Sequence, residues 1–454
     1  MKINNFKVNS KFLLGIFFMM FLQIVTAQNS FYIENRVNKY VLPFKMVNNL
    51  MIIPVEVNGR KLSFLLDTGV SNTVILNIKA KDSLKLKNIK KIKIQGLGDG
   101  EMVDAYESTH NQIKIGKNIF KKDHKIYLIL GKGFNLSSRL GEDIQGIIGG
   151  DLFKDFVIKI NYNAKKLTFY TPNKYIYKKC KKCEILPLTL MFGKPYISTN
   201  TKLSDSISIK TKLLIDSGAS DALWLFENSK NDLKVPKKYF RDYLGQGLNG
   251  NIYGKRSRIK GLDFGKFKFN NITVSFPDTL SLSKTMRHKL RQGSIGAETL
   301  IRFHLIIDYP NRKITLKKNS KNFYDDFNYN LSGIEVVLSG QILVSEKKIK
   351  DFQKSSNNFV SNAAKGVSIS LEYDYTLSLK PSMQVTDIRK GSPADLAGVL
   401  PGDYLLEVNG KPIYTYTIQS LMALFHKKAG THINLLIQRG KLHYIFDFYL
   451  KKIL

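Results

Sequence analysis

Short apolar runs separated by turn-forming residues account for most of the chain, and this pattern predicts a mostly β protein. Residues 51–57 and 62–66 are two such runs, and Asn58-Gly59 stands between them. An Asn-Gly pair between two apolar runs is the strongest local signal for a β-hairpin. The second run ends at Asp67, so this carboxylate is expected at the end of a strand.

The same order of motifs occurs twice along the chain. Residues 64–71 read Phe-Leu-Leu-Asp-Thr-Gly-Val-Ser, and residues 213–220 read Leu-Leu-Ile-Asp-Ser-Gly-Ala-Ser. Further residues recur in the same order at offsets of 149 or 147 residues, namely Gly116 and Gly265, Gly149 and Gly296, Phe156 and Phe303, Tyr162 and Tyr309, and Thr168 and Thr315. This collinear set indicates an internal duplication and predicts two similar lobes, residues 40–173 and 174–320.

A third unit is expected at residues 328–454, after a polar stretch that follows Lys318. Within it, Ser392-Pro393 is typical of a helix N-cap followed by Pro in the first turn. Residues 418–425 form a second helix-like run.

Composition changes this picture little. The 454 residues are 43% apolar, and 71 Lys+Arg against 36 Asp+Glu give a net charge of +35. Such a charge is typical either of a protein with an anionic partner or of a Lys-rich composition spread over a solvated surface. The Lys residues are scattered and no nucleic-acid-binding motif is present, so the second interpretation is favoured and no nucleic acid is expected as a partner.

The N-terminus has the pattern of a targeting segment. Lys2, Lys7 and Lys11 precede an apolar stretch at residues 12–25, and small residues follow up to Ala27. The stretch is short for a transmembrane helix, which needs about 20 residues. Residues 1–27 are therefore interpreted as a signal peptide of an exported, periplasmic or secreted protein, with an uncleaved anchor as the alternative.

The two cysteines, Cys180 and Cys183, lie in a Cys-Lys-Lys-Cys sequence. Two thiols alone do not complete a structural zinc site. Outside the cytoplasm a local disulfide is the favoured state, and two inert thiols are the alternative.

The duplicated triplets resemble the aspartic protease superfamily, in particular the retropepsin-like lobes of bacterial periplasmic or secreted proteins. The resemblance covers about residues 48–318. It rests on the Asp-Thr/Ser-Gly triplet of each half, on the apolar segments that end at Gly149 and Gly296, and on a glycine-rich hairpin tip in each half. It implies duplicated acid-protease β-barrel lobes that form a bilobal, pepsin-like unit.

The resemblance further implies that Asp67 and Asp216 are catalytic. Two carboxylates a few ångströms apart cannot both ionise cheaply, so they share one proton. The charged member then acts as a general base on a water molecule held between them, and the protonated member polarises the scissile carbonyl. The residues expected to support the two loops are Thr68, Gly69, Ser217, Gly218, Gly149 and Gly296.

The glycine-rich tips are expected to form flaps, as in the retroviral dimer. The flap candidates are Gly96, Gly98, Gly100, Gly247 and Gly250. Val70 and Ala219 stand where pepsin-like enzymes carry a hydroxyl residue that favours the charged carboxylate. The resemblance therefore implies a mildly acidic or neutral pH optimum, less acidic than that of pepsin.

The third unit resembles a PDZ domain of the bacterial protease type, which is a small α+β barrel. The segments 391–399 and 401–410 carry this resemblance. It implies that backbone N–H groups of one loop bind a peptide carboxylate and that the ligand adds a strand beside it. The residues at this loop are Leu331, Ser332, Gly333 and Ile334. The alternative is that this domain has only a structural role.

These observations together favour an exported aspartic endopeptidase with a C-terminal PDZ domain. It needs no metal or organic cofactor. Its expected partners are a peptide or protein substrate and a peptide ligand of the PDZ domain, and it is expected to be a monomer without stable membrane insertion after signal cleavage. The alternative is a catalytically inactive envelope adaptor that only binds peptides.

The signal-peptide interpretation predicts cleavage after Ala27. N-terminal sequencing of the mature protein from its native host is expected to begin at Gln28. A mature chain that still begins with the apolar stretch would support the anchor instead.

Overall fold

The computed structural model describes residues 30–34, 37–76, 84–98, 100–130, 135–228, 232–282, 291–355 and 368–454. The predicted signal peptide lies outside these residues. The chain divides into two compact units. Unit 1 extends to Tyr329 and includes Lys452–Leu454, and unit 2 is Asn330–Lys451.

The first lobe of unit 1 is a nine-stranded sheet built around the predicted hairpin. β4 (Leu50–Val57) and β5 (Arg60–Leu66) pair antiparallel. Asn58 and Gly59 between them have φ angles of 48° and 87°, which confirms the hairpin prediction. The other strands of this sheet are β1 (Tyr32–Ile33), β3 (Lys45–Val47), β6 (Thr73–Ile75), β7 (Lys90–Ile94), β8 (Val103–Ile115), β9 (Ile119–Ile129) and β10 (Gly146–Ile148).

The second lobe repeats this arrangement in an eight-stranded sheet. Its strands are β14 (Thr189–Met191), β15 (Lys194–Lys202), β16 (Ser208–Ile215), β17 (Leu223–Leu225), β18 (Tyr239–Gly247), β19 (Gly250–Phe264), β20 (Phe267–Pro277) and β21 (Gly293–Ile295). β5 pairs in parallel with β10, and β16 pairs in parallel with β21 at the same place in the repeat. The duplicated topology that the sequence predicts is therefore present.

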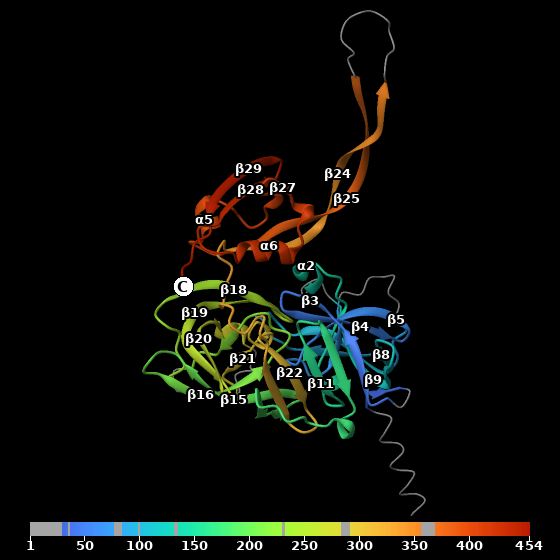
Figure 1. Ribbon diagram of the computed structural model, residues 1–454, viewed down its shortest axis with the longest axis vertical. Helices are drawn as coiled ribbons and strands as arrows, with labels where there is room; N and C mark the ends of the chain where they lie inside the picture. The colour runs from blue at the N-terminus through green and yellow to red at the C-terminus, as the bar shows by residue number, and fades with distance from the viewer. Residues whose placement is uncertain are drawn as a thin grey trace, which may run out of the picture. The chain divides into compact units, whose positions relative to one another are not determined.

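A six-stranded sheet made by both lobes joins them, in the order β13-β23-β22-β11-β12-β2. β11 (Val157–Asn161) and β22 (Phe303–Asp308) pair antiparallel at its centre, where Ile158 lies opposite Ile307 (Figure 1). The flanking strands are β2 (Lys39–Pro43), β12 (Lys166–Tyr170), β13 (Cys183–Pro187) and β23 (Lys313–Lys318). Because each lobe supplies three strands in mirrored order, this sheet is the base on which the two halves face each other.

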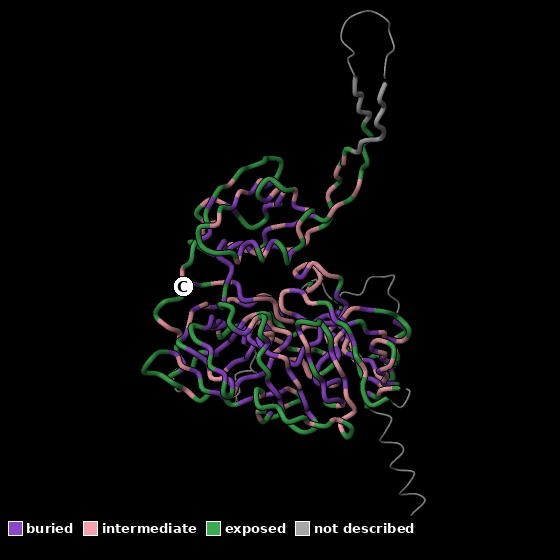
Figure 2. The backbone as a smooth tube through the Cα atoms, in the orientation of Figure 1, coloured by how far each residue is buried: buried purple, intermediate pink, exposed green. Residues whose placement is uncertain are grey.

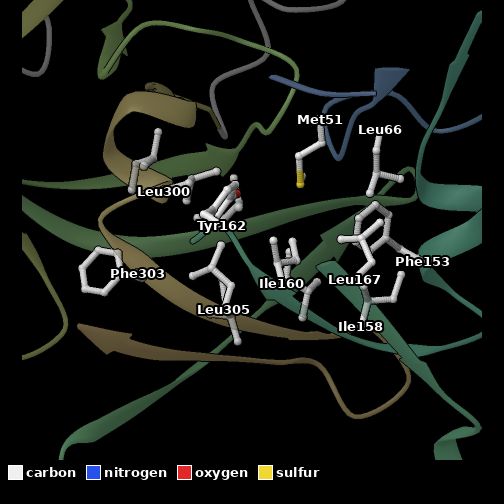
Figure 3. Close-up of a cluster of buried hydrophobic side chains, with 14 of the residues drawn as sticks. Met51, Leu66, Phe153, Ile158, Ile160, Tyr162, Leu167, Leu300, Phe303 and Leu305 are labelled. Atoms are coloured by element: carbon white, nitrogen blue, oxygen red, sulfur yellow. The ribbon is translucent and has the colours of Figure 1, made fainter. Parts of the chain in front are cut away.

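The hydrophobic core of unit 1 extends through both lobes. Figure 3 shows buried side chains from the two halves, among them Phe153 of the first lobe and Leu305 of the second. Figure 2 shows buried segments in purple through the interior of unit 1 and exposed segments in green at its loops. The α-helices among the described residues of unit 1 are short and are α2 (Leu136–Leu140), α3 (Gly150–Phe153) and α4 (Ala297–Leu300).

Unit 2 is a sheet in the order β24-β25-β26-β28-β29, with β27 paired to β26. The strands are β24 (Ile334–Ser355), β25 (Ser368–Ile388), β26 (Tyr404–Val408), β27 (Lys411–Pro412), β28 (His432–Arg439) and β29 (Leu442–Tyr449). Both helix predictions are confirmed. Ser392 accepts a hydrogen bond from the Asp395 N–H and caps α5 (Pro393–Ala397), and α6 is Ile418–Phe425.

Candidate active site

Both triplet carboxylates stand directly after a central strand of their own lobe. Asp67 follows β5 and Asp216 follows β16. The Gly69 N–H donates to Asp67 Oδ1 at 2.6 Å, and the Gly218 N–H donates to Asp216 Oδ1 at 3.2 Å. Each carboxylate is thus oriented by the glycine of its own triplet.

The glycines also bring the two carboxylates together. A Cβ atom added to Gly69 would lie 2.8 Å from Asp216 Oδ1, and one added to Gly218 would lie 2.1 Å from Asp67 Cγ. Each carboxylate therefore lies against the glycine of the opposite triplet. Any larger residue at either position would push one carboxylate away from the other.

The hydroxyl residues of the triplets lock the two loops to each other. The Thr68 N–H donates to Ser217 Oγ at 3.1 Å, and the Ser217 N–H donates to Thr68 Oγ1 at 3.0 Å. Each hydroxyl in turn donates across the lobe boundary, Thr68 Oγ1 to the Ile215 carbonyl at 2.6 Å and Ser217 Oγ to the Leu66 carbonyl at 3.0 Å. These four buried hydrogen bonds between the lobes fix how far apart the carboxylates lie.

Gly149 and Gly296 pack beneath the loops, where the resemblance places them. A Cβ atom at Gly149 would lie 2.2 Å from the carbonyl oxygens of both Asp67 and Val70, and one at Gly296 would lie 2.0 Å from the Asp221 carbonyl oxygen. The backbone of each loop therefore lies too close to these positions for any side chain.

The electrostatics of the pair favour a retained proton. Burial, and after it the negative charge of Asp216, raise the pKa of Asp67 to about 8. The Gly69 N–H and Lys194 act in the opposite direction and lower this pKa. This is the behaviour of two carboxyl groups that share one proton, so the titration belongs to the pair.

Two basic residues near the carboxylates were missed by the sequence analysis. Lys194 and Arg291 are half-buried, and both interact electrostatically with Asp67 and Asp216. At the repeat offset of 147 residues Arg291 corresponds to Ile144, so a comparison of the repeats would have singled out Arg291. Lys194 corresponds to Leu50 only through the register of the strands, because these two residues are 144 positions apart.

The two glycine-rich tips interlock. Asn249 donates its backbone N–H to the Leu97 carbonyl at 2.9 Å, and its own carbonyl accepts the Gly100 N–H at 2.7 Å. The Asn249 side chain also hydrogen-bonds to the Gly96 N–H and the Glu101 carbonyl. The flap candidates thus form a second connection between the lobes.

The backbones of the two glycine-rich tips also lie close together, and one leucine of each tip packs against the other lobe. A Cβ atom at Gly98 would lie 2.5 Å from the Asn249 carbonyl carbon, and one at Gly247 would lie 2.1 Å from the Leu97 oxygen. Leu97 packs against a second-lobe cluster, and Leu248 packs against a first-lobe cluster. Gly250 has a φ angle of 118° and allows the turn after the second tip.

The predicted carboxylate-binding loop of unit 2 requires a correction. Its residues are Leu331, Ser332, Gly333 and Ile334. Asn330 Oδ1 accepts the N–H groups of Ser332 at 3.0 Å and Gly333 at 3.1 Å, and Ser332 Oγ accepts that of Ile334 at 3.1 Å. The Leu331 N–H donates to the Phe425 carbonyl at 2.9 Å. The loop is buried and its donors are satisfied internally, so it does not offer them to a peptide carboxylate.

Three further observations concern possible ligands and anchors. Cys180 and Cys183 form a disulfide. Among the described residues, no group of three or more His, Cys, Asp or Glu side chains is arranged to hold a metal ion. No helix in the same part of the chain is long and apolar enough to cross a membrane.

Comparison with known proteins agrees with the geometry of the paired triplets. Residues 53–152 and 204–299 match the family model for aspartyl proteases, and residues 384–439 match that for PDZ domains. Each lobe therefore carries a match to the aspartyl protease family, and unit 2 carries a match to the PDZ domain. The boundaries of the family match in each lobe enclose both the triplet and the glycine beneath it.

This aspartyl protease-like chain also resembles curated proteins of a different description. "Probable CtpA-like serine protease" of Staphylococcus aureus (strain COL) is 32% identical over 96 residues, and the protein of the same name in Staphylococcus haemolyticus (strain JCSC1435) is 31% identical over 96 residues. The match covers 21% of this chain and only 18% of each relative.

The lock between the aspartyl protease lobes predicts a loss of stability in Ser217→Ala. This change leaves the buried Thr68 N–H without its acceptor, which costs about 1–3 kcal/mol. Urea unfolding followed by the fluorescence of Trp224, the single tryptophan and a buried residue of unit 1, measures the loss. Ser217→Thr, which keeps the hydroxyl, is expected to be close to wild type, and an unchanged Ser217→Ala would contradict the role of the lock.

The raised pKa of Asp67 predicts that stability depends on pH. Between the ordinary carboxyl pKa of 3.8 and about 8, the folded pair keeps a proton that the unfolded chain has lost. The free energy of unfolding of the wild type relative to Asp67→Asn is therefore expected to fall as pH rises through this window.

The same unfolding assay at pH 4, 6 and 8 tests this expectation. Asp205→Asn, at a side chain that is 86% exposed, is the matched control and should show no such trend. A difference between wild type and Asp67→Asn that stays flat or grows with pH would contradict a proton held by the pair.

Proposed function

We propose that this protein is an aspartic endopeptidase that hydrolyses peptide bonds with water activated between Asp67 and Asp216. The observation that carries the proposal is the contact of each carboxylate with the glycine of the opposite triplet, which brings one carboxyl group from each lobe to the same place. The aspartyl protease and PDZ domains themselves imply peptide or protein binding.

The chemistry follows from the shared proton. Below a pH of about 8 the pair holds one proton, because burial and the second carboxylate raise the pKa of Asp67. The ionised carboxylate takes a proton from the water as its oxygen attacks the carbonyl carbon, and the protonated carboxyl group donates a hydrogen bond to the carbonyl oxygen. The carboxyl group that took the proton from the water then gives it to the amide nitrogen as the C–N bond breaks and the amine leaves. A pair that keeps its proton at neutral pH supports the mildly acidic or neutral optimum expected from Val70 and Ala219.

The name of the staphylococcal relatives raises the alternative of a serine nucleophile. A hydroxyl, a histidine and a carboxylate do meet in the first lobe, where His124 Nε2 lies 2.7 Å from Thr73 Oγ1 and 3.0 Å from Asp151 Oδ2. Thr73 and His124 are buried, however, so this hydroxyl does not reach a substrate carbonyl. The aspartic mechanism is therefore the one proposed.

The proposal includes export, supported by the basic and apolar pattern of residues 1–27. It also gives unit 2 the task of recruiting protein substrates. The outer edge of β24 pairs with no other strand among the described residues. An extended peptide could therefore add there as a further strand.

The proposal predicts that Asp67→Asn and Asp216→Asn each abolish peptide cleavage, with a loss of roughly 10²–10⁴-fold or more, because either change removes a group needed for proton transfer. Hydrolysis of an unfolded polypeptide by the purified full-length chain measures the loss. A statine-type transition-state mimic should inhibit the wild type, and a serine-directed covalent reagent should not.

Trp224 fluorescence and circular dichroism of both variants control for folding. Asp205→Asn, at the exposed carboxylate, is the matched control and should retain full cleavage. Cleavage that survives in both dyad variants would exclude the aspartic mechanism. A folded wild type that binds unfolded polypeptide without cleaving it would favour the inactive adaptor.

A further inference from the structure

The first lobe places an apolar residue opposite its catalytic carboxylate. β4 runs antiparallel to β5, with Ile52 opposite Leu65. Continuing this register by two residues puts Leu50 opposite Asp67. Leu50 is buried in a cluster of apolar side chains, so the residue opposite Asp67 carries no charge.

The second lobe has a cation at the same position. β15 runs antiparallel to β16, with Tyr196 opposite Leu214. Continuing this register by two residues puts Lys194 opposite Asp216. Lys194 is therefore the counterpart of Leu50, and the pseudo-twofold symmetry of the dyad is broken by one full charge.

A second pair of counterparts differs in the same way. Gln145 and Gln292 have the same role in the two lobes, because each accepts a backbone N–H from the strand that leads to the carboxylate. The Ser63 N–H donates to Gln145 Oε1 at 2.8 Å, and the Lys212 N–H donates to Gln292 Oε1 at 2.7 Å. The residue before Gln145 is the buried Ile144, and the residue before Gln292 is Arg291.

These changes are grouped on one side of the dyad. The first-lobe positions pack together as an apolar wall that consists of Val47, Leu50, Ile52, Leu65 and Ile144, with Ile147 against it. Their second-lobe counterparts include Lys194 for Leu50, Tyr196 for Ile52, Arg291 for Ile144 and Ser294 for Ile147. One side of the dyad is thus apolar, and the other is cationic and polar.

Charge balance indicates what the cationic side accommodates. Arg291, Asp67 and Asp216 are the charged groups that act on Lys194, and burial lowers the pKa of both cations. A dyad that shares one proton carries a single negative charge and faces two cations. Arg291 also donates its Nε–H to the Gly293 carbonyl at 3.1 Å and lies over the Phe226 ring, and both contacts position the guanidinium. Two positive charges beside one negative charge favour an additional anion on this side.

We propose that Lys194 and Arg291 form a subsite for a carboxylate of the substrate on the second-lobe side of the dyad. This inference rests on the proposed endopeptidase function and adds a substrate class to it. The ligand is either a Glu or Asp side chain or a free peptide C-terminus. Each of these is a carboxylate, which an ammonium and a guanidinium group can bind.

Matched peptides test the subsite. Quenched fluorescent peptides with blocked ends carry either Glu or Gln at a single position, and this position is moved along both sides of the scissile bond. A third series carries Gln at these positions and has a free C-terminus. At one position the wild type is expected to have a kcat/KM roughly 10–100-fold higher for Glu than for Gln. A preference confined to the free C-terminus would support the subsite and identify the terminus as its ligand.

Two variants replace the cations by the residues of the first lobe. Lys194→Leu and Arg291→Ile are each expected to reduce the Glu-to-Gln ratio toward one. Lys210→Leu, at an exposed lysine of β16, is the matched control and should leave the ratio unchanged. A wild type without preference for either carboxylate, or a preference that both variants retain, would overturn the proposal.

Binding of the same peptides, measured by fluorescence anisotropy, separates the subsite from the catalytic proposal. Tighter binding of the Glu peptide that Lys194→Leu abolishes, in a wild type that cleaves nothing, would support the subsite and reject the endopeptidase. Cleavage without any effect of peptide charge would support the endopeptidase and reject the subsite. Trp224 fluorescence again controls for folding of each variant.

Discussion

The candidate active site depends on holding two carboxyl groups, the buried Asp67 and the half-buried Asp216, against each other. Burial and mutual repulsion both oppose ionisation of the pair, so the loops that carry Asp67 and Asp216 would separate without a restraint. The restraint is the exchange of hydrogen bonds between Thr68 and Ser217, in which each residue donates its N–H to the hydroxyl of the other. Because these donors and acceptors are buried, breaking the exchange leaves polar groups without partners. Separating the two loops therefore costs free energy, and this cost opposes the repulsion between the carboxyl groups.

The lock requires two lobes in a fixed orientation, and the duplication supplies them. The central pairing of β11 with β22 makes the base of one lobe continuous with that of the other. The glycine-rich tips also meet through Asn249, and Leu97 and Leu248 each pack into the other lobe. Neither half completes any of these contacts alone. The two lobes are therefore a single folding unit, although each has its own sheet.

The sequence predicted what depends on local pattern or on repetition. Short sequence motifs predict the hairpin at Asn58-Gly59, the helix cap at Ser392 and the duplicated topology. Lys194 was not recognised because a single lysine in a chain with 71 basic residues resembles any surface lysine, and only register with Leu50 reveals its place. The loop of unit 2 was misjudged because the residue that occupies its donors, Asn330, lies just before the motif. Side-chain hydrogen bonds of this kind leave no periodic signal.

The asymmetry around the dyad has a consequence for its proton. Lys194 lowers the pKa of Asp67 and so opposes the effect of burial. A substrate carboxylate bound by Lys194 and Arg291 would offset these positive charges and add a negative one. Both effects raise the pKa of the pair, because a nearby anion disfavours a second ionisation. An acidic substrate would thereby favour the singly protonated state that the proposed mechanism uses. A symmetric site with leucine at both positions would have no such coupling, so in the proposed subsite the difference between the lobes would link recognition of the substrate to the protonation of the dyad.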